Sequence, residues 1–231
     1  MKNINFLSFW LLLILGTATV VFNSCGKDDD SKKEEIKPSD PDKTGIGPAT
    51  STTDPGVVIN SIRWATRNVD KSGTFAAKPE DLGMFYQWNR KKGWPATGDV
   101  TGWDDSYFTG TTWEKANDPS PSGWRVPTLA EIQSLLNTDK VINVWTTQSG
   151  VIGIKFTDKV TSNSIFLPAA GARFFTDGTL YNAGLCGYYW SSTAYEFIEM
   201  TAYHLYFDDD DLADWYWIYR NVGFNVRPVA D

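Results

Sequence analysis

The sequence predicts an α+β domain built from short antiparallel strands, one main helix and long loops. Residues 128–138 combine an N-terminal helix cap with apolar side chains at helical spacing. Several other short segments are rich in β-branched and aromatic residues and are bounded by Gly, Pro, Asn or Asp. Because strands and helices do not alternate and no long repeat is visible, neither a doubly wound sheet nor a solenoid is expected.

The first 24 residues have the features of a secretory signal peptide. Lys2 supplies a positive start, an apolar run covers residues 6–22, and the small residue Ser24 comes before Cys25. The run is shorter than the roughly 20 apolar residues that a membrane-spanning helix needs. We therefore expect residues 1–24 to be removed after export.

Cys25 is the expected lipidation site. A cysteine just after such a run resembles the lipobox of bacterial lipoproteins, although Phe22 stands where the family usually has leucine. The resemblance implies a diacylglyceryl group on the thiol, and acyl chains contribute about 0.8 kcal/mol per buried CH2. The membrane is then a partner through this anchor. The alternative is an ordinary signal peptide with an incidental cysteine.

Residues 25–55 are expected to be the acylated cysteine followed by a disordered tether. The segment is mostly Lys, Asp, Glu, Ser, Thr, Pro and Gly, which offers almost nothing to bury. Its beginning, Lys27 to Asp30, resembles the export signal of Bacteroidetes lipoproteins. That resemblance implies an outer-membrane location facing the cell exterior, and a plain solvated spacer is the alternative.

Charge and cysteine content restrict the function of residues 56–231, which we take as the domain. The chain has a net charge of −7, and nucleic acid is an unsuitable partner for such an acidic protein. Apart from Cys25 the only cysteine is Cys186, so no disulfide within the domain is expected. Cys186 is interpreted as a small buried side chain, because a cysteine nucleophile needs a histidine base and the chain has only His204.

The first half of the domain is expected to be strand-poor. Residues 57–69 predict two short strands or a hairpin turning at Asn60 and Ser61. Residues 71–110 show no periodicity and are expected to be loops around a short aromatic segment at 83–88. A short helix or turn is expected at 112–117.

The main helix begins with a capping box made by Thr128 and Glu131. Pro127 fixes the approach of the chain, and an end near Thr138 is expected. Four apolar residues then fall on one face: Leu129, Ile132, Leu135 and Leu136.

Strands are expected over most of the second half of the domain. The predicted strands are residues 152–156, 164–167, 187–193 and 203–207. Residues 215–219 and 223–229 are expected to form a closing hairpin across Arg220 and Asn221.

Four stretches in matching order carry a family resemblance: residues 62–69, 83–88, 119–128, and 187–193 with 225–229. The segments Gly-Trp-Arg-Val-Pro-Thr at 123–128 and Tyr-Tyr-Trp-Ser-Ser-Thr at 188–193 are the specific ones. Together they resemble the Fibrobacter succinogenes major paralogous domain over residues 57–229, with Arg67 where many members have cysteine. The resemblance implies a C-type lectin-like fold, in which the two ends of the domain pair in one sheet with a helix against it.

The residues of these motifs are interpreted as structural, with direct ligand contact as the alternative. Trp124 is expected to anchor its loop, and Arg125 to hold carbonyls or a carboxylate such as Glu131. The motif residues are Trp64, Trp124, Arg125, Pro127, Thr128, Tyr189, Trp190, Ser191, Ser192 and Arg227.

Aromatic content and export favour a surface binding module for adhesion or for glycan or protein recognition. Aromatic residues make up 15% of the chain; most must fill the core, but rings in loop or edge segments could stack on a ligand. The residues selected for such a face are Trp94, Trp103, Tyr107, Trp113, Trp215 and Trp217.

No cofactor is required by the sequence, and calcium is the one metal considered. Asp208, Asp209, Asp210 and Asp211 could supply oxygen ligands together with Asp214. Alternate residues of an extended strand point apart, so a solvated loop is the other interpretation. The sugar-binding triplets of calcium-dependent lectins are absent.

Two other function classes stay open. A structural subunit or tip component of a surface assembly would need an exposed edge strand that accepts another chain. An enzyme related to the formylglycine-generating fold class would need a cysteine pair, and a glycosidase would need two placed carboxylates. Acidic residues are too numerous for the sequence to indicate such a pair.

Overall fold

The computed structural model describes residues 51–210 and 213–231, and within these ranges the chain is predominantly β. Several small antiparallel sheets surround a single short α-helix, α1 (Leu129–Leu135), and one 3-10 turn, η1 (Lys115–Asn117). None of the helices described is long and apolar enough to cross a bilayer. Cys25, the expected signal peptide and residues 25–50 of the expected tether lie outside the described residues.

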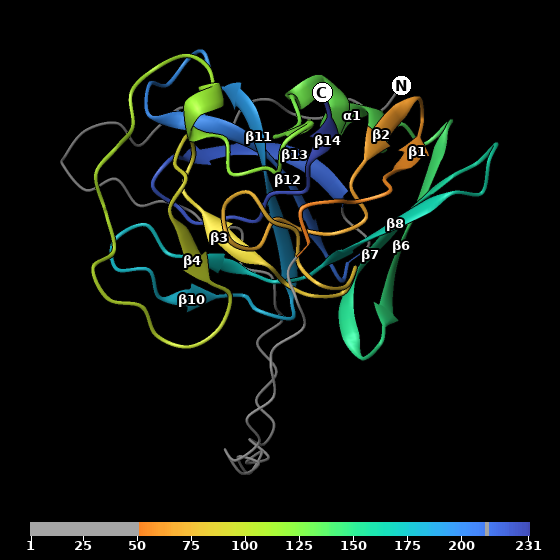
Figure 1. The fold of residues 1–231 in the computed structure, drawn as a ribbon, viewed down its shortest axis with the longest axis horizontal. Coiled ribbons are helices and arrows are strands. Elements are labelled where there is room, and N and C mark those ends of the chain that lie inside the picture. Colours follow the sequence, from red (N-terminus) through yellow and green to blue (C-terminus); the bar gives the residue numbers. More distant parts are fainter. Residues whose placement is uncertain (1–50, 211–212) are drawn as a thin grey trace, which may run out of the picture.

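The first and last strands of the described domain share one sheet (Figure 1). Its order is β1 (Val57–Ile59), β2 (Ile62–Trp64), β14 (Val229–Ala230) and β5 (Trp124–Arg125). The β1–β2 hairpin turns at Asn60 and Ser61, whose φ angles of 44° and 69° suit a tight hairpin turn. The predicted hairpin at 57–69 is therefore present, and the end of the chain returns to lie beside it.

A three-stranded sheet forms the centre of the molecule. Its order is β11 (Cys186–Ala194), β12 (Thr201–Asp208) and β13 (Ala213–Tyr219). Every residue of β12 is buried, because core clusters cover both faces of this strand. Alternating side chains divide between the clusters: Tyr188 and Tyr206 enter one, whereas Tyr189 and Leu205 enter the other with α1.

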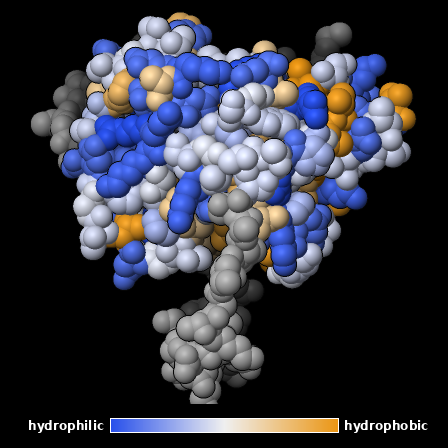
Figure 2. All heavy atoms as spheres, viewed as in Figure 1, coloured by the Kyte–Doolittle hydropathy of each residue, from blue (hydrophilic) through white to orange (hydrophobic). Residues whose placement is uncertain are grey.

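A second three-stranded sheet projects from the body (Figure 1). It consists of β6 (Val141–Gln148), β7 (Val151–Asp158) and β8 (Ser164–Pro168) in that order. Ile142, Val144 and Ile152 are exposed on the β6–β7 hairpin. Figure 2 shows hydrophobic surface gathered at the end of the molecule where β1, β2 and this hairpin lie.

Two small hairpin-like sheets complete the fold: β3 (Met84–Tyr86) with β4 (Gly93–Pro95), and β9 (Ala172–Arg173) with β10 (Leu180–Tyr181). Arg173 joins them, since its buried guanidinium donates to the carbonyls of Pro95, Thr97, Gly98 and Gly178. One side chain thus satisfies the backbone of two irregular segments.

The helix and its surroundings largely follow the prediction. The capping box between Thr128 and Glu131 is present, but α1 ends at Leu135 rather than near Thr138. The Leu136 N–H bonds to the carbonyls of both Ile132 and Gln133, which tightens and closes the last turn. The short helix expected at 112–117 is reduced to η1.

The predicted closing hairpin of residues 215–219 and 223–229 is wrong. Strand β13 pairs with β12, whereas the later segment runs through the core and bonds elsewhere. Phe224 exchanges backbone bonds with Tyr86, and the Asn225 N–H bonds to the carbonyl of Tyr188. Strand β6 was not predicted from the sequence. It pairs with β7 along its whole length.

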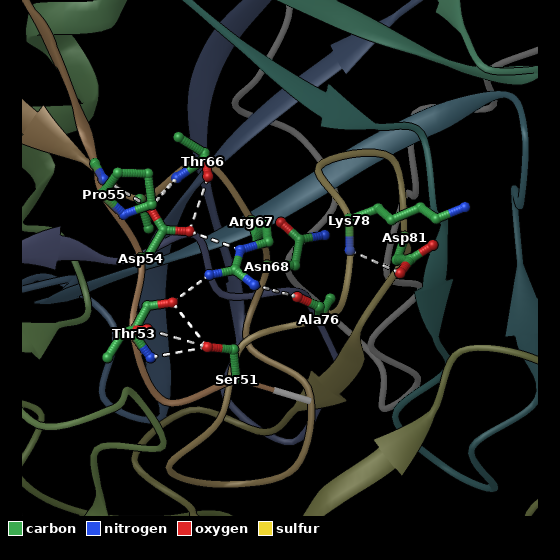
Figure 3. Close-up of polar contacts among 12 residues, drawn as sticks. Ser51, Thr53, Asp54, Pro55, Thr66, Arg67, Asn68, Ala76, Lys78 and Asp81 are labelled. Atoms are coloured by element: carbon green, nitrogen blue, oxygen red, sulfur yellow. Dashed lines mark hydrogen bonds and ion pairs between the residues drawn. The ribbon is translucent and has the colours of Figure 1, made fainter. Parts of the chain in front are cut away.

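Residues 51–55, assigned above to the tether, pack on the domain as a strap (Figure 3). The Asp54 carboxylate accepts the N–H groups of Gly56 and Thr66 at 2.8 and 2.9 Å. It also accepts the Thr66 hydroxyl and pairs with Arg67 Nε, both at 2.8 Å. Burial alone would raise the pKa of Asp54, but these four bonds outweigh it and lower the pKa.

Arg67 also holds the strap against the domain. Its guanidinium donates to the carbonyls of Thr53 and Ala76 and lies 5.3 Å from the Phe75 ring centroid. Ser51 and Phe75 form an isolated antiparallel β-bridge, in which the Phe75 N–H donates to the Ser51 carbonyl. Within the described part of the chain, contacts with the domain are therefore present from Ser51 onward, five residues before the boundary expected from composition.

Candidate functional site

Strand β13 presents aromatic side chains to solvent at the edge of the central sheet. Trp215, Tyr216 and Trp217 are 37%, 40% and 44% exposed. Large aromatic side chains usually stabilise a folded protein most when they are buried. Since side chains two residues apart share a face of a strand, Trp215 and Trp217 lie together as a candidate contact surface, whereas Tyr216 lies on the other face.

Five rings form one cluster, which we call the aromatic surface: Tyr195, Phe197, Tyr203, Trp215 and Trp217. Tyr195 stacks on Trp217 with centroids 4.7 Å apart and planes 8° from parallel. Phe197 meets Tyr195 edge-on at 5.5 Å, and Tyr203 meets Trp215 at 5.5 Å. Phe197 is 77% exposed, so the cluster extends outward from β13 instead of closing over it.

The loop between β11 and β12 places Tyr195 and Phe197 beside β13. The register of β11 against β12 shifts between Trp190 and Ala194, and a shift of this kind re-aims the side chains that follow. The Thr201 hydroxyl donates to the Ile198 carbonyl at 2.6 Å, and the Tyr195 N–H donates to the Thr201 carbonyl at 3.1 Å. These bonds close the loop between β11 and β12, and the stacking of Tyr195 on Trp217 places it beside β13.

The other face of β13 belongs to the core. Tyr216 lies over His204, which is 4% exposed and surrounded by the rings of Tyr188, Trp190 and Phe224. Burial lowers the pKa of His204 to about 3. The imidazole is therefore neutral near pH 7 and lies below the surface, away from any external substrate.

Carboxylates border the aromatic surface. The Tyr203 hydroxyl donates to Glu196 at 3.2 Å, and the Trp215 N–H donates to the Asp214 carboxylate at 2.7 Å. Burial raises the pKa of Tyr203, and Glu196 raises it further. The pKa of Tyr216 is raised by burial and then by Asp214 and Asp208. The electrostatic field at this edge is negative.

Two of the six aromatic residues chosen from the sequence are buried. Trp94 is 3% exposed and packs on Trp103 with centroids 4.8 Å apart. Trp113 is 9% exposed and packs on Trp88 at 5.6 Å. Their expected exposure is wrong because the long loops that carry them fold back over the core, where the rings fill the space between sparse strands.

The other four differ in their placement. Trp215 and Trp217 lie on the aromatic surface. Tyr107 is exposed on a separate loop and reaches Tyr219 at 5.7 Å. Trp103 is half-buried, and its indole N–H donates to the Phe175 carbonyl. The six residues therefore do not form one face.

Tyr195 and Phe197 are the members of the surface that sequence reasoning missed. The available signal was the segment Tyr-Glu-Phe-Ile-Glu at 195–199, in which apolar residues alternate with carboxylates between two strands. A turn that carries such side chains cannot bury all of them. Their proximity to β13 depended on the loop geometry, which the sequence does not reveal.

The aspartate run does not assemble a metal site within the described residues. Asp208 is buried, and its carboxylate accepts the Tyr206 hydroxyl at 2.7 Å and the Asp210 N–H at 3.1 Å. Asp209 and Asp210 point into solvent. Across residues 51–210 and 213–231 no group of three potential ligands is close enough to hold an ion, and Asp211 is outside these ranges.

The family-motif residues near the helix contact the scaffold. Arg125 forms a two-bond ion pair with Glu131 at 2.8 and 2.6 Å, and Glu131 also accepts the Thr128 N–H. The Pro127 carbonyl accepts the Ser192 N–H at 2.7 Å, which ties the helix start to β11.

The remaining motif residues also have partners within the protein. Trp124 packs edge-on against Phe75, and Trp64 is fully buried in the core that α1 covers. Within β11, the Trp190 indole donates to the Tyr86 carbonyl, Tyr189 donates to the Pro168 carbonyl, and the Ser191 hydroxyl accepts the Thr193 N–H.

Arg227, the last of these motif residues in the sequence, is 1% exposed. It donates to the Asn68 side chain at 2.9 Å and to the carbonyls of Ala65 and Phe166 at 3.3 and 3.0 Å. Burial lowers its pKa to about 10, so it is charged at neutral pH. Tyr189, close by, has its pKa raised to about 12 by burial.

Two hollows of about 170 Å³ each are lined in part by Thr66, Lys155 and Phe166, and by Asp99 and Arg173. Neither includes a residue of the aromatic surface. Cys186 is fully buried, with its sulfur 3.7 Å from the Tyr206 hydroxyl, so it does not line a surface site.

No protein-family model, curated protein or solved structure matches this chain. The geometry of the aromatic surface is therefore the basis of the functional argument.

Proposed function

We propose that this chain is a lipid-anchored surface protein whose domain binds an extracellular glycan or protein through the aromatic surface. The observation that carries the proposal is the exposure of Trp215, Trp217 and Phe197 in one cluster. Exposed clusters of large apolar side chains commonly mark contact sites. Flat rings with adjacent carboxylates can stack on a ligand and accept its hydrogen bonds.

The location in this proposal rests on the sequence features around Cys25. A lipobox-like cysteine and the acidic residues after Lys27 favour export and an outer-membrane anchor. The lectin-like fold stays part of the proposal. Its support is the shared sheet of β1, β2 and β14 and the helix that follows the Gly-Trp-Arg-Val-Pro-Thr segment.

A second candidate is a subunit or tip component of a surface assembly. The observation that favours it is the free edge of β13, which has β12 on one side and no strand on the other among the described residues. Sheet edges can accept a strand from another chain. Both candidates use the same edge of the molecule.

The test is a binding screen of the full chain, purified in detergent, on arrays of glycans and synthetic peptides. We expect dose-dependent binding that falls when Trp215 or Trp217 is replaced by Ala and that EDTA leaves unchanged. The matched control is Val144→Ala, since Val144 is 50% exposed on β6, another edge strand. Blank arrays, or equal loss in the control, would overturn the ligand-binding proposal, and blank arrays would favour the assembly subunit.

A further inference from the structure

At the outer edge of β13, the backbone N–H and C=O groups of Trp215 and Trp217 point away from the sheet. These are the two residues whose indoles are exposed on the aromatic surface. The Arg220 N–H bonds to the Met200 carbonyl at 2.9 Å, which extends the β12–β13 ladder by one residue. Bonded and unbonded positions alternate along an antiparallel pair. Ile218, Tyr216 and Asp214 therefore bond to β12, whereas Trp217 and Trp215 direct their N–H and C=O groups away from the sheet.

A second observation agrees with this alternation. The Trp215 N–H is bonded to the Asp214 carboxylate instead of to β12. This contact satisfies an outward-pointing donor with a neighbouring side chain. Strand β13 contains no Lys or Pro, and the register shift of this sheet lies between β11 and β12 rather than at the β13 edge. Of the usual devices that block strand addition, Lys, Pro and a β-bulge are thus missing from β13, and Asp214 is its one charged side chain.

The charged residues of the segment that contains β11, β12 and β13 have one sign. No Lys or Arg occurs between residues 174 and 219, although the segment contains eight carboxylates. Asp209, Asp210, Glu196 and Glu199 are exposed at the two ends of β12. A second copy of this chain would bring like charges together, whereas a basic segment would be attracted.

These observations indicate the chemistry of the occupant. A residue added opposite Trp215 or Trp217 places its side chain on the same face as the indole. Arg and Lys gain cation–π attraction over such rings, and nearby carboxylates increase it. The pattern suited to this edge is a basic residue at every second position.

We propose that β13 binds an extended basic segment of a partner protein as an added antiparallel strand, with alternate Arg or Lys side chains over Trp215 and Trp217. This inference rests on the proposed binding function and names its ligand class. It predicts binding that needs both the backbone bonds and the positive charge.

The test is calorimetric titration of the full chain in detergent with a capped peptide of four Arg-Val repeats. We expect binding that weakens with added salt and falls about 10-fold in Trp215→Ala or Trp217→Ala, consistent with the size of cation–π contacts. Val144→Ala on β6 is the matched control and should bind as the unsubstituted chain does. A peptide of four Glu-Val repeats should not bind.

Two methylated peptides test the added strand separately from charge. N-methylation of every Arg removes the donors that would face β13, whereas N-methylation of every Val leaves them intact. We expect the first peptide to lose binding and the second to keep it. Equal behaviour of the two peptides would overturn strand addition.

Other outcomes separate this inference from the proposed function. Binding of a neutral glycan through Trp215 and Trp217, with no binding of the basic peptide, would overturn the inference and leave the proposed function standing. Dimerisation of the chain through β13 in sedimentation experiments without peptide would also overturn it. Absence of any ligand on the arrays would contradict both.

Discussion

At the scale of single residues, His204 shows how the aromatic core determines chemistry. It alternates with Tyr203 and Leu205 in β12, and its side chain turns into the core with Tyr188 and Phe224. Its Nδ1 has no hydrogen-bond partner among the described residues. This placement makes His204 a structural residue of the core, because a neutral ring buried among other rings is out of reach of an external substrate.

The depressed pKa of His204 predicts a pH-dependent stability. The unfolded chain takes up a proton near pH 6.5, whereas the folded chain does so only near pH 3, so unfolding binds protons in between. Stability should therefore fall as the pH is lowered, by about 1 kcal/mol between pH 7 and pH 5.5. Urea unfolding at the two pH values measures this difference.

His204→Phe is the control for this prediction. Phe keeps the ring and removes the titrating group, and His204 is the only histidine in the chain. Carboxylates such as Asp54, whose pKa lies below its ordinary value, act only at lower pH. An unchanged pH dependence in His204→Phe would refute the assignment.

Buried arginines are a residue-scale feature that the sequence pattern did not reveal. Arg173, Arg220 and Arg227 are each about 1–2% exposed, and each donates to a backbone carbonyl far away in sequence, those of Thr97, Phe108 and Phe166 respectively. Arg220 also lies 4.2 Å from the Trp88 ring centroid. Arg227 was named as a motif residue, but its carbonyl partners depend on loop paths that no local pattern describes.

At the scale of elements, short sequence patterns predicted the helix and several strands but not which strands pair with one another. The capping box predicted α1, and short segments rich in β-branched and aromatic residues predicted β7, β8 and β12. Strand β6 was missed because all but one of its residues are half-buried or exposed and because it mixes polar with apolar side chains on an edge. The prediction of a closing hairpin was wrong because β13 pairs with β12 instead of with residues 223–229. Alternation of side chains within a strand does not show which other strand it pairs with.

The strap of residues 51–55 gives a prediction for this scale. Replacing Asp54 by Ala removes four bonds to one carboxylate and leaves Arg67 partly buried without its ion pair. We expect a loss of about 2–3 kcal/mol in the free energy of unfolding. We also expect new protease cleavage within residues 51–56, which limited proteolysis with mass spectrometry would detect.

Asp139→Ala is the comparison for the strap, because Asp139 is an exposed carboxylate. It should leave both stability and the cleavage pattern unchanged. If Asp54→Ala behaved like Asp139→Ala, the strap would not depend on this carboxylate.

At the scale of the whole molecule, the aromatic residues divide into a core and a surface. Many of them fill the two core clusters on either side of β12, as the irregular fold requires. The aromatic surface stays outside because β13 is an edge strand and the 195–200 loop holds Tyr195 and Phe197 beside it. Trp215 and Trp217 were predicted as ligand candidates, but Trp94 and Trp113 show that ring content alone does not distinguish the two roles.

The central claim is that Trp215 and Trp217 contact the ligand, and fluorine NMR tests it most directly. The full chain would be labelled with 5-fluorotryptophan, its signals assigned by single Trp→Phe variants, and the ligand found on the arrays added. We predict that the Trp215 and Trp217 signals shift in proportion to the bound fraction while those of buried Trp64 and Trp190 stay in place. Binding that leaves the Trp215 and Trp217 signals unmoved would contradict the account.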